Sequence, residues 1–207
     1  MAAPSYWPRA KRELARADPT LATIIRSRRG IALGSRGDPF QTLARSIVGQ
    51  QISVKAAESV WQKVLIAVGG AATPANIAAT AMADLRAAGL SQRKAEYVGE
   101  LANRFASRQL DPLRWPAMDD ESIITDLTAV RGVGRWTAEM FLIFNLMRPD
   151  ILPVADVGLQ RAVSLHYRNG RVLSERTLRR IAEPWAPWRS VATWYLWRSL
   201  DPVPVEY

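Results

Sequence analysis

Apolar residues recur along most of the chain at intervals of three and four, the spacing that places side chains on one face of an α-helix. Asp38-Pro39, for example, places proline at a first helical position. Phe40, Leu43 and Ile47 then follow on a single side. The strict alternation typical of a half-buried strand is scarce. The pattern therefore predicts an all-α protein with about ten helices.

Capping residues and helix breakers mark where the predicted helices begin and end. Side chains that can accept a hydrogen bond from a first-turn amide precede several of the apolar runs. Helix starts are expected at or beside Asp18, Asp38, Ser53, Thr73, Ser91, Asp119, Asp156, Ser174 and Pro187. We see no long linker and no internal repeat. We therefore expect a single unit over residues 1–207, with residues 1–17 as an N-terminal extension.

The composition narrows the class of protein and of partner. Of the 207 residues 48% are apolar and eight are tryptophan, which indicates a folded chain. Lys and Arg number 28 against 19 Asp and Glu, and the net charge of +9 favours nucleic acid or a membrane surface as partner. No apolar run reaches the ~18 residues of a membrane span, and no secretory signal is visible. We expect a soluble intracellular protein.

Two residue types limit the available chemistry. The chain contains no cysteine, which excludes disulfides, thiolate-bound zinc and cysteine-bound iron–sulfur clusters. His166 is the only histidine, so a multi-histidine metal centre is excluded too. We expect that no cofactor is required.

The most informative stretch is LTAVRGVGRWTA at residues 127–138. Gly132 and Gly134 allow an unusual backbone turn that leads directly into a helix. The N–H groups and dipole of that helix start suit a phosphate oxygen, and Arg131 and Arg135 add positive charge. A bare Gly-x-Gly is more often only a tight interhelical turn with a glycine C-cap. The whole pattern matches the helix-hairpin-helix consensus, which indicates contact with a DNA backbone without base reading.

Three further motifs, in order along the chain, carry a family resemblance. Residues 46–57 read SIVGQQISVKAA, residues 152–162 read LPVADVGLQRA, and residues 187–190 read PWRS, with Trp197 downstream. With the hairpin they resemble the helix-hairpin-helix, Gly/Pro-rich, Asp (HhH-GPD) superfamily of DNA glycosylases, in its 3-methyladenine DNA glycosylase II branch. The resemblance runs from about Asp18 to about Leu200. It implies two lobes with a DNA-binding cleft between them and a helix-hairpin-helix at about residues 120–146.

The resemblance places the family's catalytic aspartate at Asp156. Cleaving an N-glycosidic bond develops positive charge on the sugar, and a fixed carboxylate stabilises that charge and orients the attacking water. An alkylated purine is already cationic and leaves as a neutral base without a strong general acid. Taken alone, Asp156 is more simply the N-cap of a helix, and the two roles are compatible.

The same resemblance implies a base pocket. Trp136 and Trp197 are expected to receive a base flipped out of the stack, because electron-rich indole faces favour a cationic purine. Met140 stands where some relatives carry an aromatic residue. The other tryptophans are expected in the core: Trp7, Trp61, Trp115, Trp185, Trp188 and Trp194.

The contacts to DNA are also implied by the resemblance. Gln51, with Gln50 as second choice, is expected to fill the gap that the flipped base leaves, although a polar helix-capping pair is the simpler alternative. Backbone contacts are expected from Gly132, Val133, Gly134, Arg135, Thr137 and Ser53. The hairpin carbonyls of Val130 and Val133 are a candidate site for Na⁺ or K⁺.

Departures from known relatives define the reaction. Bifunctional relatives carry a lysine two residues after the second hairpin glycine, where this chain has Trp136, and indole cannot form a Schiff base. They also commonly carry a four-cysteine iron–sulfur motif. Better-known bacterial members begin with a β-rich domain, which we do not expect here.

With the resemblance, we expect a monomeric base excision repair enzyme that acts on double-stranded DNA and not on a membrane. It would remove 3-methyladenine and 7-methylguanine without strand cleavage, in the bacterial cytoplasm at the nucleoid or in a eukaryotic nucleus. Three alternatives stay open: a non-catalytic helix-hairpin-helix module, a glycosylase of this superfamily for other damaged bases, and a helical protein-binding scaffold.

Overall fold

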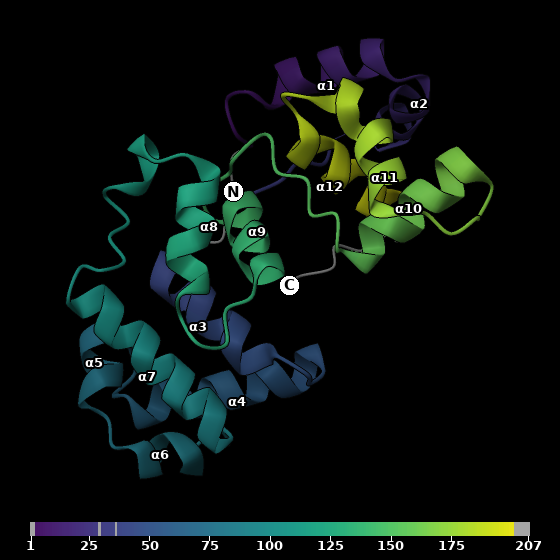
Figure 1. Cartoon of the computed structure of the whole chain (residues 1–207). Helices are drawn as coiled ribbons and strands as arrows, with labels where there is room; N and C mark the ends of the chain where they lie inside the picture. Colours follow the sequence, from purple (N-terminus) through teal and green to yellow (C-terminus); the bar gives the residue numbers. More distant parts are fainter. Residues whose placement is uncertain (1–2, 29, 36, 201–207) are drawn as a thin grey trace. The chain divides into compact units, whose positions relative to one another are not determined.

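The computed structural model describes residues 3–28, 30–35 and 37–200, and within them every regular element is helical. The twelve α-helices of these residues are α1 Trp7–Ala17, α2 Pro19–Ser27, α3 Pro39–Gly49, α4 Val54–Ala67, α5 Pro74–Ala79, α6 Met82–Ala87, α7 Gln92–Ala106, α8 Asp120–Thr128, α9 Arg135–Phe144, α10 Val157–Arg168, α11 Glu175–Ala182 and α12 Arg189–Leu200 (Figure 1). Two 3₁₀ helices, η1 Trp115–Ala117 and η2 Glu183–Trp185, lie between them. The all-α prediction is confirmed.

The chain divides into two compact units. Among the described residues, unit 1 comprises residues 3–28, 30–35 and 142–200, and unit 2 comprises residues 37–141. The division falls inside α9, after Phe141. Two units agree with the two lobes expected, and the DNA-binding cleft stays a prediction. No helix of the described residues is long and apolar enough to cross a membrane.

The helices begin where the capping pattern predicts. Asp38 accepts the Gln41 N–H at 2.8 Å, and Pro39 occupies the first position of α3. Ser53 caps α4 and Ser91 caps α7 in the same way. Because each cap acts on an amide three residues away, these boundaries are local properties of the sequence.

Unit 1 packs around a cluster of aromatic side chains. Helix α1 packs on α2 and α12, and α10 packs on α12. Trp7 lies edge-on to Trp194, with ring centroids 5.2 Å apart, and stacks on Tyr195, with centroids 5.7 Å apart. Residues 7–17 of the expected extension therefore contribute a helix to the core of this unit.

Unit 2 is organised on α7, which packs against α3, α5 and α6, while α4 packs on α3. A row of edge-to-face rings runs from Phe40 through Phe105 and Trp115 to Phe141, with centroids 5.3, 6.0 and 5.2 Å apart.

The six tryptophans expected in the core are each less than 10% exposed: Trp7, Trp61, Trp115, Trp185, Trp188 and Trp194.

Candidate functional site

Asp156 is a buried carboxylate at the start of α10. It is 4% exposed. Its Oδ1 accepts the Leu159 main-chain N–H at 2.6 Å, which makes it the N-cap, and also the Trp197 indole N–H at 2.8 Å. The Leu159 donor belongs to α10 and the Trp197 donor to α12, so one carboxylate oxygen is held by two helices. Asp156 is thus both a cap and a carboxyl group with a fixed orientation.

Trp197 is fixed by two contacts within unit 1. Its N–H is directed at Asp156, and its ring lies parallel to that of Phe144, with centroids 5.7 Å apart and an angle of 11° between the planes. The indole is 4% exposed. The sequence predicted a base-stacking role for Trp197, and the structure adds a hydrogen bond that orients the carboxylate.

Gly158 leaves the space in which this pair meets. A Cβ placed on Gly158 would lie 3.1 Å from Asp156 Oδ1 and 3.1 Å from Trp197 Cδ1. Both distances are shorter than ordinary van der Waals contact. A side chain at position 158 would therefore displace the carboxylate or the indole.

A second aspartate in unit 1 has a similar environment. Asp18 caps α2 and is 7% exposed, and it accepts the Trp185 indole N–H at 2.8 Å and the Tyr167 hydroxyl at 2.7 Å. Burial and the hydrogen bond to Asp18 raise the pKa of Tyr167. An indole-bound buried aspartate is therefore not by itself a sign of catalysis, and the assignment of Asp156 needs its motif.

The hairpin turn joins α8 and α9 in unit 2. Gly132 has a φ of +86°, and a Cβ there would lie 2.8 Å from Tyr97 Cγ and closer still to Cδ2. Val133 is 4% exposed and donates its N–H to the Val130 carbonyl at 3.1 Å. Around Gly134, by contrast, a Cβ would meet nothing within 4 Å. The turn is closed toward Tyr97 and open at Gly134, just before the N-terminus of α9.

Both hairpin arginines form ion pairs. Arg131 Nε lies 2.6 Å from Glu100, and Arg135 lies 2.9 Å from Glu121 and 3.1 Å from Glu139. These carboxylates raise the pKa of each guanidinium. The sequence predicted positive charge beside the turn, but the described residues of unit 2 include 11 basic and 11 acidic residues, and those of unit 1 include 15 and 6. The excess of positive charge lies in unit 1.

The loop after α3 holds the two glutamines of the predicted wedge. Gln50 is half-buried, and its Nε2 donates to the Gly132 carbonyl at 2.7 Å. Gln51 is exposed and has a φ of +58°. Gln50 thus binds the hairpin turn, and Gln51 is the exposed member of the pair.

The remaining predicted residues lie on α9 and at the N-cap of α4. Trp136 is 38% exposed and Met140 is 6% exposed, four residues apart on α9, where side chains share a face. Thr137 is half-buried. Ser53 is exposed, and its hydroxyl accepts the Ala56 N–H at 3.2 Å.

Four residues of the site escaped the sequence analysis: Lys94, Tyr97, Glu100 and Phe144. The first three recur at intervals of three on α7. That spacing is the signal that could have found them, because it puts a cation, an aromatic ring and an anion on one helical face. In the sequence, Phe144 has the pattern of an ordinary core residue.

Comparison with known proteins identifies the family. The sequence profile of the HhH-GPD superfamily base excision DNA repair proteins matches residues 44–187. DNA-3-methyladenine glycosylase 1 of Schizosaccharomyces pombe is 32% identical over 166 residues, which cover 78% of this chain and 72% of that protein. The chain spans 66 to 72% of the length of three such curated relatives.

Two solved structures extend the comparison. DNA-3-methyladenine glycosidase from Bacillus halodurans is 38% identical, with a TM-score of 0.86 over 94% of this chain and 89% of that one. The S. pombe 3-methyladenine DNA glycosylase in complex with abasic DNA is 27% identical, with a TM-score of 0.77 over 95% of this chain and all of that one. The chain therefore belongs to the HhH-GPD superfamily of base excision DNA repair proteins.

Proposed function

We propose that this protein is a monofunctional DNA glycosylase that hydrolyses the N-glycosidic bond of alkylated purines in double-stranded DNA. 3-Methyladenine and 7-methylguanine are the proposed substrates. The observation that carries the proposal is Asp156, a buried carboxylate oriented by the Leu159 and Trp197 N–H groups within the matched family segment. The names of the relatives, which are 3-methyladenine glycosylases, support the substrate class.

The chemistry assigned to Asp156 is electrostatic. As the bond between the base and C1′ breaks, its electron pair leaves with the alkylated purine, which becomes neutral. Positive charge develops on the sugar, and the carboxylate stabilises it. Water then adds to C1′ and gives its proton to the carboxylate or to solvent. A donor-fixed carboxylate needs little reorganisation during this step.

Selectivity for a cationic base is assigned to α9. The exposed part of the Trp136 indole offers an electron-rich face, and Met140 lies one turn further along the helix. A methylated, positively charged purine is attracted to such a face more strongly than a neutral one. The position of Trp136, where a bifunctional enzyme has lysine, supports base removal without strand cleavage.

DNA binding is assigned to the hairpin and to the basic surface of unit 1. Gly134 leaves the start of α9 accessible to a phosphate, and the exposed Gln51 is the better candidate for the wedge. Exposed arginines of the α10–α11 region add attraction for a polyanion: Arg161, Arg168, Arg171, Arg176 and Arg180. One flipped nucleotide requires one site, so the enzyme is proposed to act as a monomer. Its substrate is DNA, so the proposed location is the nucleoid or a nucleus.

The hairpin carbonyls partly fit a monovalent cation. The Val130 carbonyl accepts the Val133 N–H, and a carbonyl oxygen has a second lone pair for an ion. The neighbouring carbonyls already accept donors, since Arg104 binds Ala129 and Gln50 binds Gly132. A bound Na⁺ or K⁺ would draw phosphate toward the turn, and the proposed reaction has no step that requires it.

The deciding experiment measures base release. A duplex with a single 7-methylguanine, and methylated DNA that contains 3-methyladenine, are incubated with the full chain, and freed bases are quantified by mass spectrometry. We expect both bases to be released and the strand to stay uncut. Asp156→Asn keeps a good capping residue, so it should fold and bind DNA but lose about 10²–10⁴-fold in rate. Equal release by this variant would contradict the mechanism, and no release by the wild type would contradict the function.

A further inference from the structure

One face of α7 contacts both segments that are assigned to DNA. Its side chains at positions 94, 97, 100 and 104 follow the three- and four-residue spacing of a single helical face. Each reaches either the loop after α3 or the hairpin turn. All of these residues belong to unit 2.

Lys94 binds the loop of the proposed wedge. Its Nζ donates to the Val48 carbonyl at 2.8 Å and to the Gln50 carbonyl at 2.7 Å. These carbonyls lie at the C-terminal end of α3, where a cation satisfies unpaired acceptors and favours the helix dipole. Burial lowers the pKa of Lys94, and the two carbonyls stabilise its ammonium there. Lys94 thus fixes the main chain immediately before the turn at Gln51.

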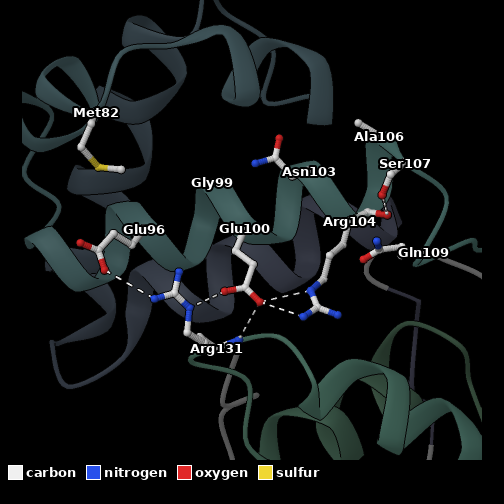
Figure 2. A pocket seen from close by; sticks show the side chains of 10 residues that line it. All are labelled: Met82, Glu96, Gly99, Glu100, Asn103, Arg104, Ala106, Ser107, Gln109 and Arg131. Atoms are coloured by element: carbon white, nitrogen blue, oxygen red, sulfur yellow. Dashed lines mark hydrogen bonds and ion pairs between the residues drawn. The ribbon is translucent and has the colours of Figure 1, made fainter.

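The hairpin is bound by the next residues of the same face. The Tyr97 ring packs on Gly132, and Glu100 accepts the Arg131 Nε–H at 2.6 Å and its main-chain N–H at 3.5 Å. Arg104 donates to Glu100 at 3.1 Å. Figure 2 shows Glu100 between the two guanidinium groups, with Arg131 beside α7.

Gln50 and Gln51 connect the two contacts. The Gln50 side chain donates to the Gly132 carbonyl, so the loop also contacts the hairpin directly. Gln51 has a φ of +58°, a left-handed conformation that is strained for a residue other than glycine and persists only where its surroundings enforce it. The preceding residue is held twice, because Lys94 binds the Gln50 carbonyl and the Gln50 side chain binds the Gly132 carbonyl.

We propose that α7 is the positioning element of base flipping, and that Lys94 fixes the wedge loop at a constant distance from the phosphate-binding turn. This inference rests on the proposed function and deepens it. A flipped base is trapped only if the wedge enters the stack while the hairpin holds the strand, so a loop that moves independently of the turn would lose flipping and keep the chemistry at Asp156. Lys94 is therefore a positioning residue and not a catalytic one.

The first test uses the protein alone. Hydrogen exchange is measured on peptides that cover residues 49–53 and 130–135, for the wild type and for Lys94→Met, which keeps the aliphatic stem and removes the donors. We expect at least about 10-fold faster exchange at 49–53, because hydrogen bonds from a charged donor are lost. Lys94→Arg should restore slow exchange. Lys63→Met, an exposed lysine of α4, is the matched control and should change nothing. Unchanged exchange in Lys94→Met overturns the proposal.

The second test separates flipping from chemistry. Single-turnover release of 7-methylguanine is compared in two duplexes, one with cytosine opposite and one with an abasic site opposite, where no pair must be broken. We expect Lys94→Met to lose about 10-fold on the first duplex and less than about 2-fold on the second, with Lys94→Arg close to wild type. Equal losses on both duplexes would overturn the positioning role. If the wild type releases no base while exchange still rises in Lys94→Met, the proposed function fails and the positioning of the loop stands.

Discussion

Asp156 accepts the Trp197 indole N–H at 2.8 Å on Oδ1, the same oxygen that caps helix α10. One oxygen of the carboxylate is therefore fixed by donors from α10 and α12 before any substrate binds. In the proposed mechanism this preorganisation matters, because a group that is already oriented needs little reorganisation as charge develops in the transition state. The orientation of Asp156 is thus a property of two helices of unit 1.

Replacing Trp197 by phenylalanine should slow base release without altering the fold. A phenyl ring that can stack on Phe144 is kept, while the donor to Asp156 and one of the two fused rings of the indole are lost. A hydrogen bond to a charged group contributes about 1.5–3 kcal/mol, so we expect a fall of about 10-fold or more in the single-turnover rate. The loss should be equal for 3-methyladenine and 7-methylguanine, as measured by mass-spectrometric release.

The chain supplies a matched control for this variant. Trp185 donates to Asp18 with the same 2.8 Å geometry, so Trp185→Phe removes an equivalent bond away from the proposed chemistry. We expect it to lower the midpoint of thermal unfolding and to leave the single-turnover rate unchanged. If both variants slow release equally, the effect of Trp197→Phe comes from general destabilisation.

Gly158→Ala should misplace the carboxylate. The added Cβ would lie 3.1 Å from Asp156 Oδ1 and from Trp197 Cδ1, so one of them must move by a few tenths of an ångström. Because rates depend steeply on such displacements, we expect about a 10-fold loss of rate at unchanged DNA affinity. Gly99→Ala in α7, where a Cβ meets nothing within 4 Å, should instead stabilise the protein by about 0.5–1 kcal/mol and keep full activity. Full activity of Gly158→Ala would show that the site tolerates the shift.

The sequence could predict those helix boundaries and turns that residues close by in the chain determine. Helix starts at Asp38 and Ser53 follow from caps that act three residues away. The left-handed turn at Gly132 follows from glycine spacing. Helix α9 ends at Phe144, two residues before the expected end of the helix-hairpin-helix at about residue 146, because the Arg148 N–H returns to the Leu142 carbonyl and Met147 takes a φ of +56°.

Tertiary contacts could not be predicted in this way. Trp197 binds Asp156 across 41 residues, and Lys94 binds Gln50 across 44. Nothing in the local pattern shows that Arg131 is paired with Glu100, 31 residues earlier. The sequence therefore indicated positive charge at the hairpin, while the partners that neutralise it appear only in the fold.

His166 gives a direct test of burial near the end of α10. Burial lowers its pKa below the ordinary value of 6.5, and its Nε2 lies 2.8 Å from the Ser199 hydroxyl. Between the folded pKa and 6.5 the unfolded chain binds a proton that the folded chain does not. The free energy of unfolding should therefore rise with pH up to about 6.5 and show no further contribution above it. Because His166 is the only histidine, its NMR titration is unambiguous, and a midpoint at or above 6.5 would contradict the burial.

Replacing the two hairpin glycines by alanine should have different effects: loss of stability at Gly132 and loss of DNA affinity at Gly134. Gly132 combines a φ of +86° with the Tyr97 ring against its Cα, so Gly132→Ala should destabilise the protein by about 1–3 kcal/mol in urea unfolding. Gly134 has open space around it, so Gly134→Ala should fold with unchanged stability. A Cβ at Gly134 would nevertheless occupy the approach to the N-terminus of α9.

DNA affinity distinguishes the two effects at the hairpin. If a phosphate binds the start of α9, Gly134→Ala loses about 10-fold or more in affinity for duplex DNA, measured by fluorescence anisotropy at fixed salt, although its stability is that of the wild type. The loss should be the same for methylated and unmodified duplexes, because backbone contacts carry no base information. Wild-type affinity in Gly134→Ala would mean that the turn serves only to connect α8 and α9, and the phosphate site would then have to be sought on the arginines of α10 and α11.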